Sequence, residues 1–194
     1  MAESLPLSHR KRVATRQRIA ESAVRLAAES GLTATTADRI AEAAEVGRAT
    51  FFRYFSTKED AIAEGMNQRW LGRITEALAA QPADLSAIQA IAAAFEELAH
   101  GFDDIAAHIQ ELETLTRSSP ALRAWTLHTY MSYEEAIAEL IAPRIPDLTE
   151  HDLRPRLVGA LTMATVRLAL DDWLAHGGSL PGRVQRGLAA INID

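Results

Sequence analysis

The sequence contains no cysteine, which excludes disulfide bonds and thiolate chemistry and suits a reducing, cytoplasmic environment. No apolar run reaches the roughly 20 residues that a membrane-spanning helix needs. The longest run covers 14 residues, 157–170, and contains Arg167. No apolar stretch follows the basic N-terminus, so we expect no signal peptide and a cytoplasmic protein.

Residues that favour β-strands are sparse, and aromatic residues make up only 6% of the chain, whereas Ala and Leu are abundant. This composition predicts an all-α protein. At 194 residues, the chain is long enough to bury a substantial hydrophobic core in one domain or in two small ones.

The net charge of −6 argues against a polyanionic partner, but the charge is unevenly distributed. Residues 1–58 contain 10 Lys and Arg against 6 Asp and Glu, a net charge of +4. Residues 59–194 contain 10 Arg against 20 Asp and Glu, a net charge of −10. A basic head can contact phosphate while the acidic remainder stays in solvent. Chance clustering of surface charge is the alternative.

Hydrophobic periodicity and helix-boundary residues predict about nine helices. Their expected ranges are 15–30, 35–44, 48–55, 57–80, 84–100, 103–117, 120–141, 152–176 and a short segment from 181. Gly31 is placed to end the first helix, and Ser56 and Glu59 form a capping-box pattern before the fourth. Residues 1–12 are expected to be a mobile basic arm.

The stretch 35–60 has the pattern of a helix-turn-helix. Two short helices meet across a turn of three residues, Glu45, Val46 and Gly47. Small residues, Ala41 and Ala44, stand where the helices would cross, and Val46 would plug the turn from below. We therefore expect a DNA-binding domain over residues 1–58 and a second helical domain over 59–194. An ordinary helical hairpin is the alternative.

The second of these short helices should bury Phe51 and Phe55 together, because they are four residues apart. The remaining residues would then form an outward face that mixes Arg, Thr and aromatic side chains. Such a face makes a poor core and suits a DNA groove.

Residues 10–60 closely resemble the DNA-binding domain of the tetracycline-repressor (TetR) family of transcriptional regulators. The features that carry the resemblance are the helix-ending glycine, the Thr-Thr helix start, the apolar plug, the aromatic run and one lysine: Gly31, Thr35, Thr36, Ile40, Ala41, Val46, Phe51, Phe52, Tyr54, Phe55 and Lys58. The resemblance implies a homodimer whose third helices enter successive major grooves of double-stranded operator DNA.

Carried over by position, the resemblance also implies individual DNA contacts. Arg48 would face base edges, where it can read guanine bidentately. Phe52 stands where the family usually has a DNA-facing tyrosine, and would keep an apolar contact but lose a bond to phosphate. Phosphate contacts would add affinity without reading sequence. The implied set is Thr36, Tyr54 and Lys58 for phosphate, Arg48, Ala49 and Thr50 for base edges, with Gly47, Phe52 and Arg53 beside them.

Glu45 departs from the family pattern, which usually has glycine at this turn position. A left-handed backbone at a non-glycine residue costs on the order of 1 kcal/mol. The carboxylate also places negative charge near DNA. The basic residues of the arm and first helix are further candidates for phosphate or minor-groove contacts, or form a solvated tail: Arg10, Lys11, Arg12, Arg16 and Arg18.

For the second domain, the family implies an effector cavity and a dimer interface made by the last two helices. The helix 152–176 has an apolar face, and the terminal segment adds three more residues: Leu157, Leu161, Ala164 and Leu168, then Val184, Leu188 and Ile191. Two such helices from each protomer would form a four-helix bundle. Packing of this face inside one chain is the alternative.

Cavity residues are expected where polar or aromatic side chains interrupt apolar helix faces. This criterion selects Phe95, His108, Trp125, His128, Tyr133, Met163 and Arg167. Arg167 must be paired or solvated, and Asp171, one turn further on, is the alternative to a ligand as its partner. The Arg-bearing helix that ends in Asp171, Asp172 and Trp173 resembles TetR members that sense acyl-CoA-like effectors. An apolar pocket with one cation would suit a long anionic amphiphile.

These features predict a sequence-specific DNA-binding regulator, a repressor released from its operator by a small, largely apolar ligand. We expect no cofactor, no metal site and no catalytic residue. An enzyme is the rival class, but a di-iron bundle needs two Glu-x-x-His pairs, and only Glu97 and His100 form one. A helical ligand-binding adaptor without DNA binding is the other alternative, which Glu45 favours.

Overall fold

The computed structural model describes residues 7–117 and 120–191. Over these residues it contains nine α-helices, one short 3₁₀ helix and no strand, which confirms the predicted all-α class. The chain divides into two compact units, Met1–Arg69 (unit 1) and Trp70–Asp194 (unit 2). No helix in the described part of the chain combines the length and the apolarity needed to cross a membrane.

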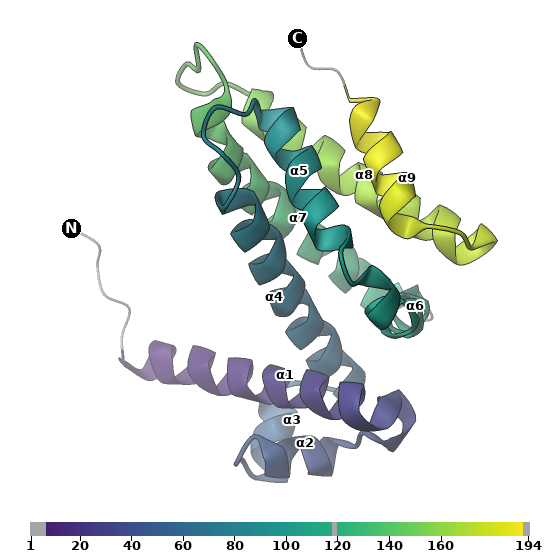
Figure 1. Cartoon of the computed structure of the whole chain (residues 1–194). Coiled ribbons are helices and arrows are strands. Elements are labelled where there is room, and N and C mark those ends of the chain that lie inside the picture. Colours follow the sequence, from purple (N-terminus) through teal and green to yellow (C-terminus); the bar gives the residue numbers. More distant parts are fainter. Residues whose placement is uncertain (1–6, 118–119, 192–194) are drawn as a thin grey trace. The chain divides into compact units, whose positions relative to one another are not determined.

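Unit 1 consists of α1 (Leu7–Ala34), α2 (Ala37–Ala43), α3 (Arg48–Tyr54) and the first half of α4 (Lys58–Ala79) (Figure 1). The prediction of a mobile arm is wrong for residues 7–12, which are helical, and residues 1–6 lie outside the described part. Good helix formers such as Leu, Arg and Lys fill this segment, which follows Pro6. Gly31 interrupts α1 as predicted, with a positive φ of 78°.

The capping box at the start of α4 lies one residue later than predicted. The backbone N–H of Thr57 donates to Oδ2 of Asp60 (3.0 Å), and the backbone N–H of Asp60 donates to Oγ1 of Thr57 (3.0 Å). These reciprocal bonds satisfy donors at the helix start. The predicted pair, Ser56 and Glu59, is therefore wrong, because two overlapping pairs fit the same sequence pattern.

The first half of α4 belongs to unit 1 because its inner face packs against α1. Ala61, Ile62 and Ala63 are buried. Gly65 lies so close to α1 that a Cβ there would be 2.3 Å from the carbonyl oxygen of Ala20. For this reason the unit boundary falls after Arg69, further along the chain than the division after residue 58 that we predicted.

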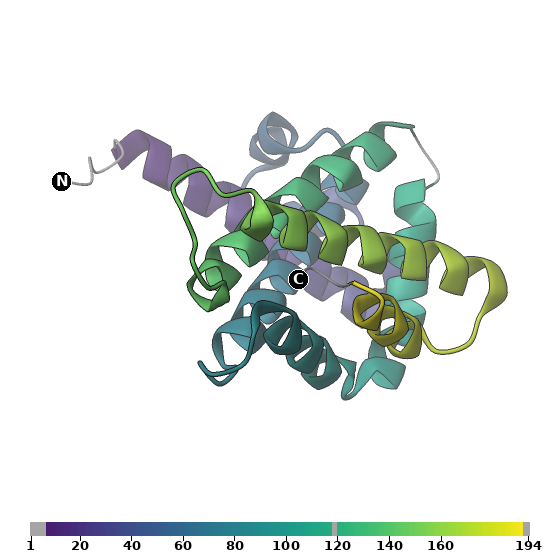
Figure 2. The same ribbon diagram turned by 90° about the horizontal axis from the view of Figure 1, so that it is seen from above.

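Unit 2 contains the rest of α4 and the remaining helices: α5 (Ala87–Ala99), α6 (Phe102–Arg117), α7 (Pro120–Ile141), the 3₁₀ helix η1 (Ala142–Arg144), α8 (Arg154–His176) and α9 (Leu180–Ala189). Helices α7 and α8 lie side by side, and α9 packs against both α8 and α5 (Figures 1 and 2). Gly159 of α8 permits the close crossing with α7, since a Cβ there would lie 2.4 Å from the carbonyl oxygen of Glu134.

Candidate DNA-binding surface and effector cavity

Helices α2 and α3 form the predicted helix-turn-helix. Thr36 caps α2, and its hydroxyl accepts a hydrogen bond from the backbone N–H of Arg39 (3.2 Å). Gly47 is the N-cap of α3. The turn is closed by a hydrogen bond from the N–H of Val46 to the carbonyl of Ala41 (2.9 Å). Val46 is half-buried beneath this turn.

Glu45 has a left-handed backbone, with φ of 52°. The turn therefore adopts a conformation that glycine favours, although glutamate occupies the position. Its backbone N–H donates to the carbonyl of Glu42 (3.0 Å), and its side chain is exposed. The helix-turn-helix therefore forms without glycine at this position.

Two phenylalanines anchor α3 to the core of unit 1. Phe51 is fully buried and Phe55 is 3% exposed, with ring centroids 6.0 Å apart, so the predicted joint burial is confirmed. Phe52 points outward and is 45% exposed, although its ring contacts that of Phe51 edge-to-face at 5.2 Å. This anchoring fixes which face of α3 meets solvent.

The outward face of α3 carries two arginines. Arg48 forms an ion pair with Asp38 of α2, and its guanidinium lies 5.2 Å from the Phe52 ring centroid. Arg53 lies 5.6 Å from the ring of Tyr54. Six residues of the expected set are exposed, and the other three are half-buried: Thr36, Gly47, Arg48, Ala49, Phe52 and Arg53, then Thr50, Tyr54 and Lys58.

Lys58 makes internal contacts that its expected role as a phosphate anchor did not include. Its ammonium donates to the carbonyls of Leu32 (2.7 Å) and Thr35 (2.8 Å), and so ties α4 to the end of α1. Oε1 of Glu59 also lies 3.8 Å from this ammonium, so an acidic group already faces its third donor. Sequence pattern alone did not reveal this clamp, because its acceptors are backbone groups distant in the chain.

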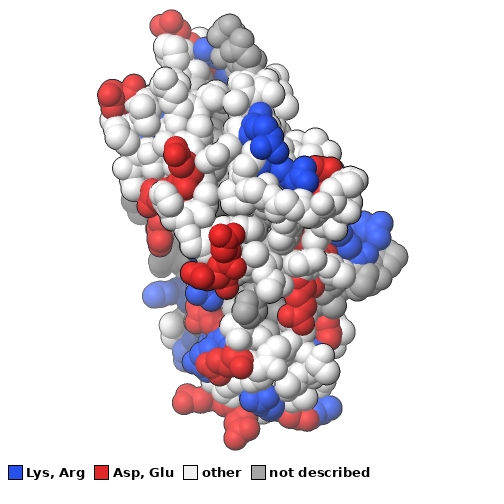
Figure 3. Space-filling model, turned by 45° about the vertical axis from the view of Figure 1, so that its right-hand side comes forward, with Lys and Arg blue, Asp and Glu red and all other residues white. Residues whose placement is uncertain are grey.

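Two basic residues expected to contact phosphate, or to lie in a solvated tail, form hydrogen bonds within unit 1. Arg16 donates through Nε to Glu64 (2.6 Å) and through Nη1 to the carbonyl of Tyr54 (2.8 Å). Arg18 donates through Nε to the carbonyl of Ala44 (2.8 Å). The solvated-tail alternative is therefore wrong for these two residues, and phosphate contact stays a prediction. Arg16 is half-buried, whereas Arg10, Lys11, Arg12 and Arg18 are exposed on α1. On the face in Figure 3, acidic and basic groups are interspersed.

Unit 2 contains a partly open, mostly apolar cavity of about 150 Å³. Helices α4 to α9 line it with mostly hydrophobic side chains: Trp70, Ile74, Phe95, Leu98, Ala99, Phe102, Ile109, Glu113, Tyr130, Tyr133, Met163, Val166, Leu170, Leu180, Pro181 and Val184. Glu113 is the charged residue among them. An apolar cavity of about this size accommodates a ligand such as benzene.

Three predicted cavity residues, Phe95, Tyr133 and Met163, line this cavity. His128 does not, because α7 turns it to solvent. Arg167 is also absent from the lining and lies 3.9 Å from Asp171, which favours the intrahelical ion pair over a ligand contact. The side chains of His108 and Trp125 lie outside the described residues.

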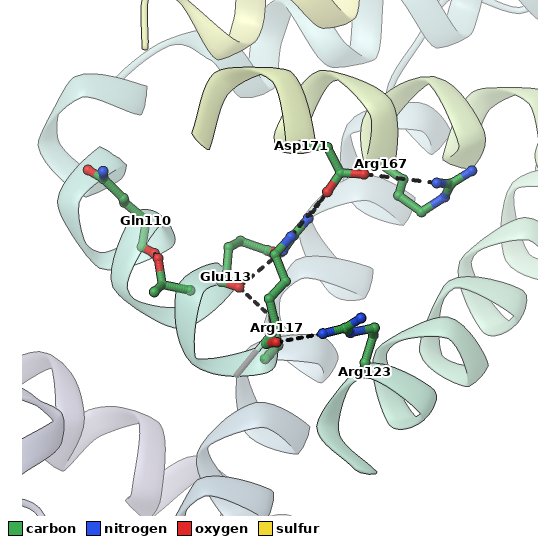
Figure 4. A network of polar contacts seen from close by, with 8 residues as sticks. Gln110, Glu113, Arg117, Arg123, Arg167 and Asp171 are labelled. Carbon is green, nitrogen blue, oxygen red and sulfur yellow. Dashed lines mark hydrogen bonds and ion pairs between the residues drawn. The ribbon is translucent and has the colours of Figure 1, made fainter. Parts of the chain in front are cut away.

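A polar network crosses from α6 to α8 at the cavity wall (Figure 4). Arg117 pairs with Glu113 one turn earlier and, through Nη2, with Asp171 of α8 (2.7 Å). Arg167 pairs with the other side of Asp171, so acidic and basic side chains alternate along the network. Burial raises the pKa of the Glu113 carboxyl above its ordinary value, although Arg117 opposes this shift.

Comparison with known proteins follows the same division of the chain. Residues 19–64 match the family described as bacterial regulatory proteins, tetR family. Residues 85–192, more than half of the chain, match the MftR C-terminal domain. The chain belongs to the TetR family.

Individual TetR-family relatives are similar over most of their length. The HTH-type transcriptional regulator TcmR of Streptomyces glaucescens is 30% identical over 178 residues, which are 86% of this chain and 76% of TcmR. FadR of Thermus thermophilus, a TetR-family repressor solved with lauroyl-CoA, is 25% identical with a TM-score of 0.64, over 90% and 91% of the two chains. A TetR regulator from Rhodococcus shares the fold at 20% identity, with a TM-score of 0.61 over 95% and 100%.

The apolar face of α8 is exposed in this TetR-family chain. Leu157, Leu161 and Leu168 are 51%, 41% and 59% exposed. In α9, by contrast, Val184 and Leu188 are buried in the core of unit 2. The expectation that these two residues contribute to a dimer interface is thereby corrected, because they are used within one chain.

Sequence reasoning missed Glu113 and left Tyr130 out of the cavity residues that it selected. Glu113 lies one helical turn beyond the buried Ile109, so an acidic residue on an apolar stripe was the available signal. Tyr130 is one of several aromatic residues on α7, and the sequence alone did not indicate which of them face the cavity. Glu97 accepts a hydrogen bond from Gln81 (3.2 Å), and the described residues hold no group of three or more His, Asp or Glu placed to bind a metal ion.

Proposed function

We propose that this TetR-family regulator is a homodimeric repressor that binds double-stranded operator DNA through α3. A small, largely apolar effector in the unit 2 cavity then releases it. The observation that carries the proposal is the orientation of α3, which buries Phe51 and exposes Arg48, Phe52 and Arg53. An exposed face that mixes arginines with an aromatic ring suits the edges of bases in a major groove.

The DNA contacts that we propose divide into two kinds. Arg48 leaves Asp38 and reads a base, with Ala49, Thr50 and Phe52 beside it. Phosphates are held by the hydroxyls of Thr36 and Tyr54, by Arg53 and by Lys58, which turns its third donor from Glu59 to the phosphate, and Gly47 lies beside them. These phosphate contacts position the protein without reading sequence.

We propose that α4 couples the cavity to DNA binding. Its second half contributes Trp70 and Ile74 to the cavity, and its first half contributes Ile62 to the core of unit 1. A ligand that shifts the second half therefore acts on both units through one helix. In a dimer, the two recognition helices must lie about 34–36 Å apart to fit adjacent grooves, so a small shift weakens binding.

Similarity to FadR, which was solved with lauroyl-CoA, supports an apolar effector for this domain. Two features of this chain bear on the acyl-CoA hypothesis. The cavity of about 150 Å³ is of the size that holds benzene, and a long acyl chain would have to extend out of its open side. Arg167, which we expected to anchor an anion, pairs with Asp171 outside the lining. We therefore propose a smaller effector without an anionic group inside the cavity.

A gel-shift assay with the DNA that flanks this gene tests the proposal. A specific shift that weakens with salt is expected, as is a loss of base preference in Arg48→Ala. Arg186→Ala serves as the control, because it removes an exposed arginine of α9. Absence of any specific, salt-sensitive shift would favour the alternative of a ligand-binding adaptor.

The coupling is tested separately by crosslinking the dimer while it is bound to its operator. Crosslinked protein should stay on DNA when effector is added, because the spacing of its recognition helices is fixed. Release of the crosslinked protein would contradict the proposed role of α4.

A further inference from the structure

We infer that the cavity selects an uncharged small molecule with one hydroxyl group, which Tyr130 and Glu113 bind. The inference rests on the proposed function of the cavity as the effector site. It adds the chemical class of the effector, which neither the sequence nor the similarity to FadR supplies.

Tyr130 lines the cavity with a polar group that lacks a partner. The residue is 9% exposed, and its hydroxyl oxygen has no hydrogen-bond partner among the described residues. Buried polar groups in folded proteins are almost always satisfied. A ligand that accepts a hydrogen bond from this hydroxyl would restore the interaction that the hydroxyl lost when it left water.

Glu113 supplies an acceptor in the same cavity. Arg117 binds Oε2 of its carboxylate, and a carboxylate has about four acceptor positions, so it can accept a further bond from a ligand. Burial and the nearby negative charge of Glu113 raise the pKa of Tyr130, which keeps that hydroxyl protonated. Tyr130 therefore enters the site as a donor and Glu113 as an acceptor.

A hydroxyl group matches this pair because it accepts one hydrogen bond and donates another. A carbonyl can only accept, and an anion would lose its hydration in a mostly apolar lining that contains no lysine or arginine. A cation gains little, because Arg117 already neutralises Glu113. The adjoining surface groove shares Ala99, Phe102 and Pro181 with the cavity. Its charged residue, Asp103, is acidic, as is Glu113 in the cavity.

Titration calorimetry with the full-length protein and four probes of one ring each tests the inference: phenol, toluene, benzoate and benzylamine. At neutral pH phenol is uncharged and should bind about tenfold more tightly than toluene, with benzoate weaker still. Tyr130→Phe should weaken phenol about three- to tenfold and leave toluene unchanged. Glu113→Gln should weaken phenol and reduce the discrimination against benzoate.

Thr162→Val is the matched control, because it removes a buried hydroxyl that bonds the carbonyl of Val158 and does not line the cavity. Its affinity for phenol should equal that of the unmodified protein. An equal loss in this variant and in Tyr130→Phe would overturn the inference, since the effect would then be one of general stability.

The remaining outcomes separate this inference from the proposed function. Equal affinity for toluene and phenol, preference for benzylamine or benzoate, or no binding of any probe each overturns the hydroxyl class. Operator binding measured on the same preparation decides the proposed function independently. If the protein binds phenol but does not bind operator DNA, the inference about the effector holds and the proposed repressor function is wrong.

Discussion

The guanidinium of Arg48 and the carboxylate of Asp38 form an ion pair that joins the first turn of α3 to the first turn of α2. Both side chains are 62% exposed. Exposed pairs of this kind contribute about 0.2–1 kcal/mol. The arginine that we propose as the base-reading residue is therefore held by a carboxylate in the free protein, and operator DNA must compete for it.

Replacement of Asp38 should strengthen operator binding. Asp38→Asn removes the competitor of Arg48 and a negative charge beside DNA, so affinity should rise about two- to fivefold, as expected for an exposed pair. Fluorescence anisotropy with labelled operator at fixed salt measures it. Glu42→Gln removes an exposed charge of the same helix without freeing Arg48. An equal gain in that variant would show that charge alone matters.

The left-handed backbone at Glu45 should make glycine the more stable residue there. Glu45→Gly relieves the strain of a φ of 52°. The free energy of unfolding should rise by up to about 0.5 kcal/mol, because the greater freedom of glycine in the unfolded chain offsets part of the roughly 1 kcal/mol of relieved strain. Urea denaturation measures it. Gly47→Ala should have little effect. Its φ of −72° and the open space around an added Cβ permit alanine, whose lower freedom in the unfolded chain is offset by its poorer N-cap preference. A Glu45→Gly variant less stable than the unmodified protein would show that the left-handed backbone at Glu45 does not destabilise the fold.

The buried carboxyl of Glu113 predicts a dependence of stability on pH. Burial raises the pKa of this carboxyl in the folded protein, so the folded state binds its proton more tightly than the unfolded state does. The stability that this adds is fully present below the ordinary pKa of 4.5. It is lost as the pH rises through the folded value. Glu113→Gln does not titrate, so the stability of the unmodified protein relative to this variant should fall as the pH rises from 4.5.

Thermal unfolding of both proteins across that range measures the difference. Glu111→Gln changes an exposed carboxylate of the same helix and is the control. A pH-dependent difference of the same size in the control would exclude burial of Glu113 as the cause.

The exposed leucines of α8 should hold the dimer together. Leu161→Asp places a charge in that face and should convert the dimer to monomer, with loss of operator binding, because a buried unpaired charge is strongly unfavourable. Leu148→Asp is the matched control, since both leucines are 41% exposed and Leu148 lies before α8. Sedimentation velocity reports the assembly state. A Leu161→Asp protein that stays dimeric would refute this interface.

Local sequence patterns predicted the helices and the DNA-binding motif for a physical reason. Helix periodicity, Gly31 and the spacing of Phe51 and Phe55 act over a few residues, so the chain encodes them locally. The same locality explains the errors. Thr57 with Asp60 and Ser56 with Glu59 match one pattern equally well, and the choice between them depends on the surrounding fold.

Sequence by itself thus determined the class of fold, the motif and the outward face of α3. Tertiary structure decided which charged side chains have partners, because Glu64 for Arg16 and the carbonyls of Leu32 and Thr35 for Lys58 are far away along the chain. It also brought Glu113 into the cavity and left Arg167 outside. Burial depends on packing between helices, and no single helix contains that information.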